Sequence, residues 1–265
     1  MSLLMMLPMT LFMTVMNKVS EKIINIYKNM RREKITINSF VHAYNRGNRK
    51  QEIVRDNKDK WHFLDILYYL NDEFSGANLF REIKSSLMTV VNKPFVRPDI
   101  WPEKKPLVKI INFSLLENHY HLFLKEIRDG GISLFMKRLG TSMARYFNTK
   151  YKESGRLFQG PYKMKRIDEE MYFKYLSVYI QVKNVFEIYP GGYEKAVNEF
   201  EKAYNWAIKY PYCSLADYAN ERNSPIIDKD VLGELFNNPQ EYKEFARQCL
   251  EKINLDDKLG KLIID

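Results

Sequence analysis

The 265-residue sequence has few cysteines, and this scarcity excludes several kinds of site. Cys213 and Cys249 are present without Cys-x-x-Cys spacing, so neither a disulfide framework nor a cysteine-rich zinc site is expected. The sequence also lacks a P-loop, a Gly-rich dinucleotide fingerprint and an internal repeat. Its one uncharged apolar stretch, Met1–Met16, is broken by Pro8 and is shorter than the roughly 20 residues of a membrane span. We therefore expect a reduced, cytoplasmic protein without a membrane partner.

The N-terminal 29 residues are expected to lie outside the working part of the protein. They lack the basic start and the small-residue cleavage site of a secretory signal. Val19–Met30 has only weak helical spacing. One interpretation is that Met30 is the true start of translation, and a membrane anchor is the alternative.

The sequence is basic, with a formal net charge of +9 and a pI near 9.2, which favours a polyanionic partner. Between residues 137 and 166, nine basic residues accompany one acid and carry nearly the whole net charge. A second basic stretch runs from Met30 to Lys60. Aromatic residues alternate with the cations of the first stretch, as suits single-stranded nucleic acid, where bases stack on rings and cations follow phosphates. The alternative is a solvated basic face above ordinary core aromatics. The cations proposed to bind nucleic acid are Arg46, Arg49, Lys137, Arg138, Arg145, Arg156, Lys163, Lys165 and Arg166.

The apolar stretch Leu115–Leu124 reads as a buried strand that contains two of the four histidines. Because side chains alternate along a strand, His119 and His121 point to the same face, about 7 Å apart along the backbone. Two imidazoles on one rigid face can hold a metal ion. The alternative is a pair of hydrogen-bonded core histidines, since so short a motif is weak evidence.

The remaining pattern predicts alternating strands and helices. Strands are expected at 35–44, 107–116, 119–125 and 162–167, and helices at about 56–70, 130–147, 169–184, 193–209, 229–236 and 241–252, with a short helix near 79–88. Asp56 and Asp168 are the predicted N-caps of the first and third helices. The helix that opens at Gly130 has an apolar stripe that includes Phe135, Leu139 and Met143, and this stripe is typical of core packing.

Several segments, in this order, resemble the single-tyrosine HUH transposases, and within them the REP-associated tyrosine transposase-like branch. They are Val41-His42-Ala43-Tyr44-Asn45-Arg46-Gly47-Asn48-Arg49, Asn118-His119-Tyr120-His121-Leu122, Gly130-Gly131-Ile132 through Ser142, Tyr146-Phe147-Asn148, Gly155–Gly160 and Leu176-Ser177-Val178-Tyr179-Ile180. The resemblance covers roughly residues 39–184 and implies an α+β fold: a ferredoxin-like antiparallel sheet with flanking helices (the HUH endonuclease fold), plus a small C-terminal helical extension. It divides the chain into an extension (1–29), a catalytic domain (30–190) and a C-terminal helical extension (191–265).

The resemblance also implies a function and a site. The family cleaves and rejoins single-stranded DNA, often beside a hairpin, through a tyrosine that becomes linked to a 5′ phosphate. By position Tyr179 corresponds to this nucleophile, and His119 and His121 to the ligands of a divalent ion, Mg²⁺ or Mn²⁺. A phenol with an ordinary pKa near 10 is a weak nucleophile, so a cation beside the phosphate makes chemical sense. By spacing alone, Tyr172 and Tyr175 remain alternatives to Tyr179.

Two positions depart from the family pattern. Lys183 stands one helical turn after Tyr179, where insertion-sequence relatives have a metal-binding Gln, and a lysine is suited to neutralise phosphate instead. Glu117 replaces a common proline and is a weak candidate for a third metal ligand. The departure at Lys183 motivates an alternative function, a catalytically inactive, domesticated protein that binds hairpin or single-stranded DNA. A replication or plasmid-transfer HUH nuclease is disfavoured because a third histidine is missing. The sequence leaves open a monomer or a homodimer that exchanges tyrosines.

Overall fold

The computed structural model describes residues 35–74, 95–252 and 255–260. The predictions for the first 29 residues, for a start at Met30 and for a helix near Leu79–Met88 lie outside these ranges. Within them, no helix combines the length and the apolarity needed to cross a membrane.

The fold is built on a four-stranded antiparallel sheet. Its elements follow the order β1 (Phe40–Arg46), α2 (Asn57–Tyr69), β2 (Val108–Leu115), β3 (His119–Glu126), α4 (Gly131–Tyr151) and β4 (Lys163–Ile167). The strands are arranged β2-β3-β1-β4, and each neighbouring pair is antiparallel. A βαββαβ chain with this strand order is the ferredoxin-like arrangement, which confirms the predicted fold class.

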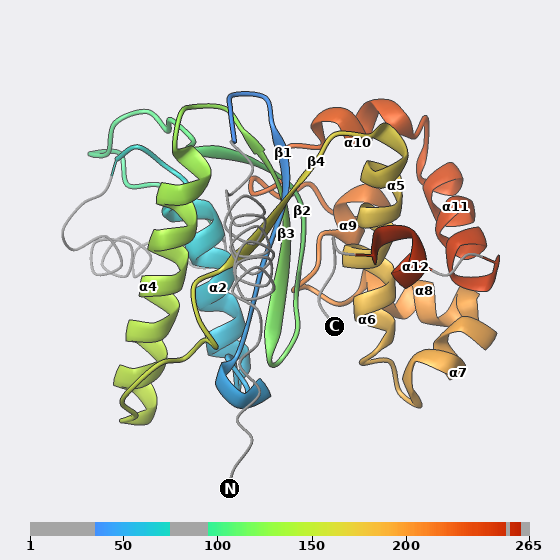
Figure 1. The fold of residues 1–265 in the computed structure, drawn as a ribbon, viewed down its shortest axis with the longest axis horizontal. Coiled ribbons are helices and arrows are strands. Elements are labelled where there is room, and N and C mark those ends of the chain that lie inside the picture. Colours follow the sequence, from blue (N-terminus) through green and yellow to red (C-terminus); the bar gives the residue numbers. More distant parts are fainter. Residues whose placement is uncertain (1–34, 75–94, 253–254, 261–265) are drawn as a thin grey trace, which may run out of the picture. The chain divides into compact units, whose positions relative to one another are not determined.

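Helices α2 and α4 cover one face of the sheet (Figure 1). Asp56 caps α2 in a reciprocal box with Asp59, which explains why this helix begins where the sequence predicted. The apolar stripe of α4 is buried, including Phe135, Leu139 and Met143. These side chains form one core with the residues of β1, β2 and β3 that point to the same face.

The other face of the sheet is covered by the helices that follow β4 (Figure 1). Its elements are α5 (Glu170–Val178), a π-helical turn η2 (Tyr179–Lys183), α6 (Asn184–Phe186), α7 (Gly192–Asn198), α8 (Phe200–Ile208), α9 (Leu215–Tyr218), α10 (Asp230–Leu235), α11 (Pro239–Lys252) and α12 (Leu255–Leu259). Their apolar side chains form a second core with Phe123 and Ile111 of the sheet. Strand β3 is therefore buried on both faces, which accounts for its nearly continuous apolar sequence.

Local predictions differ from the structure in three places. The first strand starts at Phe40 instead of residue 35, because Asn38 adopts a left-handed conformation and Ser39 bonds back to Thr36. The predicted N-cap Asp168 accepts a hydrogen bond from Arg166 instead of capping α5. The predicted helix 193–209 is divided into α7 and α8 at Glu199, whose backbone is not helical.

Candidate active site

The sheet face below α5 and η2 gathers the polar side chains of the site. Alternation along β3 places His119 and His121 on this face, next to Phe123 of the second core. The register of β1 pairs Tyr44 with His121 and Arg46 with His119, so these side chains point to the same side. Both predicted metal ligands therefore lie on one rigid surface.

The hydrogen bonds around His119 leave its Nε2 available. Nδ1 of His119 lies 2.6 Å from Oδ1 of Asn118, and Nδ2 of Asn118 donates to the backbone carbonyl of Lys50 at 3.2 Å. The second bond fixes which end of the amide faces the imidazole. Since an amide oxygen only accepts, Nδ1 of His119 carries the ring proton and Nε2 carries the lone pair.

His121 is fully buried and stands beside a third imidazole. Its Nδ1 lies 2.9 Å from Nε2 of His42, and the two rings are stacked with centroids 5.1 Å apart. Among the described residues, its Nε2 has no hydrogen-bond partner. The ring of His119 is perpendicular to that of His121, at a centroid distance of 5.0 Å.

Both candidate ligands are in the neutral form that binds metals. Burial, followed by the charge of Arg46, lowers the pKa of His119 to about 4. Burial also holds the pKa of His121 well below its usual range, with further lowering by the neighbouring histidines and cations. Each ring therefore offers a lone pair near neutral pH without first losing a proton.

Tyr179 lies directly over these histidines in the same chain. Its ring is perpendicular to that of His121 at a centroid distance of 5.3 Å and lies 6.3 Å from the ring of His42. The side chain is 4% exposed. Tyr179 is also the first residue of η2, where Asn184 donates its backbone N–H to the carbonyl of Tyr179. Single π-helical turns inside α-helices occur frequently at functional sites.

Lys183 brings a positive charge to the same place. Its ammonium nitrogen lies 5.3 Å from the ring centroid of Tyr179 and 5.7 Å from that of Tyr193. It also forms an ion pair with Glu187 at 3.7 Å. Lys183, the predicted departure from the family pattern, is thus a cation beside the candidate nucleophile.

Among the described residues, the other tyrosines of α5 have no ring contact with the histidines. Tyr175 stacks on Phe245 of α11 at 5.8 Å, and Tyr172 packs at the edge of the second core. A different tyrosine, Tyr44 of β1, lies close to the histidines, with its ring centroid 5.9 Å from that of His121. Tyr44 is therefore the second phenol to consider as a nucleophile.

The donors on this face fit a divalent ion that keeps open coordination positions. Two neutral imidazoles would supply nitrogen ligands, and among the described residues no group of three or more His, Cys, Asp or Glu side chains could hold a metal. Glu117 is exposed in the turn between β2 and β3. The remaining positions would be filled by water and phosphate oxygens, as is usual for Mg²⁺.

Three of the predicted nucleic-acid-binding cations share the histidine face, and two more lie in loops at the end of β1; we call the five the basic rim (Arg46, Lys163, Lys165, Arg49 and Arg156). Lys163 and Lys165 are paired with Tyr44 and His42 across β4 and β1, and so share their face. The loop that carries Arg156 is tied to the turn that carries Arg49, since the N–H of Asn48 donates to the carbonyl of Leu157 at 2.8 Å. That turn starts at Gly47, where an added Cβ would lie 2.0 Å from the carbonyl oxygen of Gln51.

The other four predicted cations lie away from the histidine face. Lys137, Arg138 and Arg145 belong to α4, on the opposite side of the sheet. Arg138 donates to the backbone carbonyls of Leu70 and Asp72, at the end of α2. Arg166 alternates with Lys165 on β4 and therefore points to the α4 side. The basic segment 137–166 is thus divided between the two faces of the sheet.

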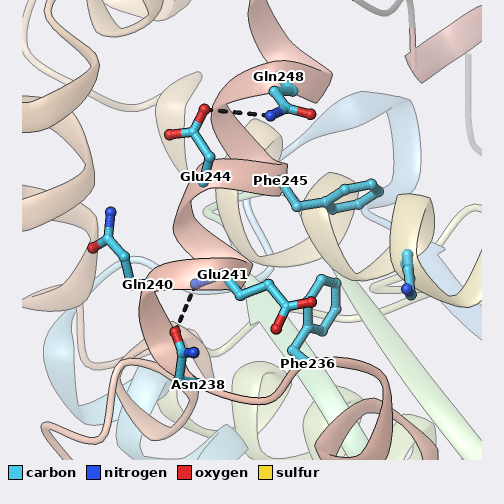
Figure 2. A pocket seen from close by; sticks show the side chains of 8 residues that line it. Phe236, Asn238, Gln240, Glu241, Glu244, Phe245 and Gln248 are labelled. Carbon is cyan, nitrogen blue, oxygen red and sulfur yellow. Dashed lines mark hydrogen bonds between the residues drawn. The ribbon is translucent and has the colours of Figure 1, made fainter.

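An open pocket of about 550 Å³ lies apart from these residues (Figure 2). It is lined by Phe236 and Phe245, by Lys174 of α5 and by polar side chains of α11. Glu241 and Glu244 add acidic groups to its wall, which disfavours a polyanionic ligand there.

Sequence reasoning did not single out His42 as part of the site. It stands between Val41 and Ala43 in a predicted strand, and a lone polar ring between apolar neighbours was the available signal. Its contact with His121 joins residues 79 positions apart, which local spacing does not reveal.

A family model agrees with the resemblance seen in the sequence over part of the chain. Residues 103–183 match the family model described as "Transposase IS200 like", and this segment runs from just before β2 to Lys183 and contains both candidate ligands and Tyr179. A search of curated proteins gave no match. Among solved structures, the chain is similar to that of a REP-associated tyrosine transposase bound to a REP hairpin, with 12% sequence identity, a TM-score of 0.41, and coverage of 74% of this chain and 87% of the other.

Proposed function

We propose that this chain, which resembles the IS200-like transposases over residues 103–183, is a single-stranded DNA endonuclease and strand transferase with Tyr179 as its nucleophile. The observation that carries the proposal is the contact of the Tyr179 ring with His121, at a centroid distance of 5.3 Å within one chain. The family match and this contact are independent, because one compares sequences and the other comes from packing between η2 and the sheet.

The reaction exchanges one phosphate ester for another. The phenol oxygen of Tyr179 attacks the phosphorus, the bond from phosphorus to the 3′ oxygen breaks, and the phenol proton ends on the released 3′ hydroxyl. The DNA downstream of the cut then remains attached to the protein through a 5′-phosphotyrosine. Because a phosphodiester is conserved, a 3′ hydroxyl can reverse the step and rejoin strands without another energy source.

The side chains around Tyr179 have separate roles in this proposal. His119 and His121 would hold Mg²⁺ or Mn²⁺ through their Nε2 atoms, and the bound ion would polarise the scissile phosphate and orient it. Lys183 places its charge within 5.3 Å of the Tyr179 ring, where it favours the phenolate and the phosphate oxygens. Arg46, paired with His119 in the sheet, would contact the same phosphate.

The basic rim gives the DNA a path to this site. Lys163 and Lys165 follow β4 beside His42 and Tyr44, and Arg46 and Arg49 follow the end of β1. Cations in such a row can contact successive phosphates of a single strand, with or without a neighbouring hairpin. We place the protein in the cytoplasm, where such a substrate is available.

The proposal is tested by incubating the protein with a hairpin-flanked single strand, labelled at its 3′ end, in the presence of Mn²⁺. A labelled protein band that resists denaturation is expected for the wild type and is expected to be absent with EDTA. Replacement of both His119 and His121 by Ala should abolish the band. If the wild type binds this DNA tightly and forms no covalent product with Mg²⁺ or Mn²⁺, the endonuclease assignment is wrong.

A second candidate function is DNA binding without cleavage. It is favoured by one observation, that Lys183 forms an ion pair with Glu187 and occupies the place of a metal ligand. Under this alternative the basic rim still holds DNA while no phosphotyrosine forms. The same assay separates the two functions.

A further inference from the structure

We propose that His42 is a positioning residue that accepts a hydrogen bond from Nδ1–H of His121 and thereby keeps the lone pair of His121 on Nε2. The inference rests on the proposed function for its link to metal binding, and on the contacts of His42 for its geometry. The family match begins at residue 103 and does not include this residue.

The contact between the two imidazoles requires one proton between them. Nε2 of His42 and Nδ1 of His121 are 2.9 Å apart, and both rings are completely buried. One nitrogen must donate and the other accept, which leaves two arrangements. In the first, Nδ1 of His121 donates and its Nε2 carries a lone pair. In the second, Nδ1 accepts and Nε2 of His121 carries the proton.

The surroundings of His121 favour the first arrangement. Its Nε2 is buried and has no hydrogen-bond partner among the described residues. In the metal-free protein Nε2 is unsatisfied in either arrangement, at a cost of about 1–3 kcal/mol. A bound cation satisfies a lone pair at Nε2, whereas a proton there needs an acceptor, and none of the described residues supplies one. The ring of His119, the other candidate ligand, lies beside it at a centroid distance of 5.0 Å. The first arrangement thus leaves both Nε2 atoms ready to bind a cation.

His42 is held in place from two sides. Its own ring lies 4.9 Å from that of Tyr44 and 6.3 Å from that of Tyr179, measured between centroids. A partner fixed in this way limits rotation of His121 and keeps its orientation when no cation is bound. Partners of this kind typically change metal affinity by 10–100-fold when they are removed.

Two substitutions distinguish the effect of the His42–His121 hydrogen bond from the effect of the shape of the His42 ring. His42→Phe keeps an aromatic ring and removes the acceptor, whereas His42→Gln restores an acceptor through its amide oxygen. His62→Phe is the matched control, since His62 stacks on Tyr146 at the other face of the sheet. Circular dichroism and thermal unfolding establish that each variant is folded.

The first measurement is the ¹⁵N spectrum of the histidine rings in the metal-free protein. We expect an unprotonated Nε2 for His121 in the wild type and a mixture of tautomers in His42→Phe. A wild-type spectrum with the proton on Nε2 of His121 overturns the inference, whether or not the variants fold.

The second measurement is a Mn²⁺ titration of the protein without DNA, in which electron paramagnetic resonance detects the bound ion. We expect a 10–100-fold weaker dissociation constant for His42→Phe, recovery of most of the affinity in His42→Gln, and no change in His62→Phe. A folded His42→Phe that binds Mn²⁺ like the wild type, or a His42→Gln as weak as His42→Phe, overturns the role of His42 as an acceptor. If the wild type has the expected tautomer and binds no Mn²⁺, the assignment of His42 stands and the metal chemistry of the proposed function is wrong.

Discussion

Replacement of Tyr179 by Phe removes the proposed nucleophile and little else. The phenylalanine ring retains the edge contact with His121, at a centroid distance of 5.3 Å in the wild type, and fills the same buried space. Loss of one hydroxyl typically changes the free energy of unfolding by only about 0.5–1.5 kcal/mol, so the variant should fold. Binding of DNA, which we propose to depend on the basic rim, should remain within a few-fold of the wild type.

The covalent product should fall to background in Tyr179→Phe. Loss of an acid or base typically lowers a rate by about 10²–10⁴-fold and leaves a measurable remainder. Loss of the attacking atom leaves none, because a phenyl ring cannot form the phosphate ester. The assay uses a strand labelled at its 3′ end, so that the label stays with the phosphotyrosine, and a denaturing gel.

The matched control is Tyr44→Phe, which removes the other buried phenol near His121. This variant should still form the covalent product. Peptide mass spectrometry identifies the attached residue in the wild type. A product that survives in Tyr179→Phe and disappears in Tyr44→Phe would identify Tyr44 on β1 as the nucleophile. Attachment of the DNA at Tyr175 or Tyr172 would refute the geometric reasoning altogether.

Three further predictions concern DNA binding and stability. Arg46→Ala should weaken binding of single-stranded DNA and lower the slope of log affinity against log salt by about 1, while Lys137→Ala, on the opposite face, should leave both unchanged in a salt titration. Burial raises the pKa of Asp65 from 3.8 to about 6, so ionisation of this carboxyl opposes folding as pH rises through this window. In denaturant titrations, Asp65→Asn should therefore raise the free energy of unfolding by up to about 3 kcal/mol at pH 8 and have little effect near pH 3. Equal effects at the two pH values would contradict this reasoning. Gly47→Ala should lower the free energy of unfolding by about 1–3 kcal/mol, because the new Cβ would lie 2.0 Å from the carbonyl oxygen of Gln51. Thermal unfolding measures this, and an unchanged melting temperature would show that the turn relaxes without cost.

The features that local chemistry controls could be predicted from the sequence. Helix α2 spans Asn57–Tyr69 because Asp56 and Asp59 cap it and its apolar spacing is helical, and both signals are present in a few consecutive residues. The apolar stripe of α4 and the alternation that places His119 and His121 on one face are equally local. The topology was expected from the resemblance to the HUH transposases and not from local spacing, and the strand order β2-β3-β1-β4 agrees with it.

Features that depend on the register between distant segments could not be predicted. The contact between His42 and His121 depends on how β1 pairs with β3, and no local pattern determines that register. Charge density along the chain predicted a basic surface, but it did not predict that the cations would be divided between the two faces of the sheet. Lys163 on β4 shares the face of the histidines, whereas Lys137 on α4 lies on the opposite side. The π-helical turn at Tyr179 also lacks a local signal, because the surrounding apolar residues are compatible with an ordinary helix.

In the proposed reaction, the contact of Tyr179 with His121 inside one chain has a kinetic consequence. A reaction centre completed within one molecule needs no encounter between two copies of the protein. With DNA in excess, the initial velocity of adduct formation should rise in direct proportion to enzyme concentration, and dilution should leave the turnover per molecule constant. A quadratic dependence at low concentration would mean that the phenol is exchanged between subunits.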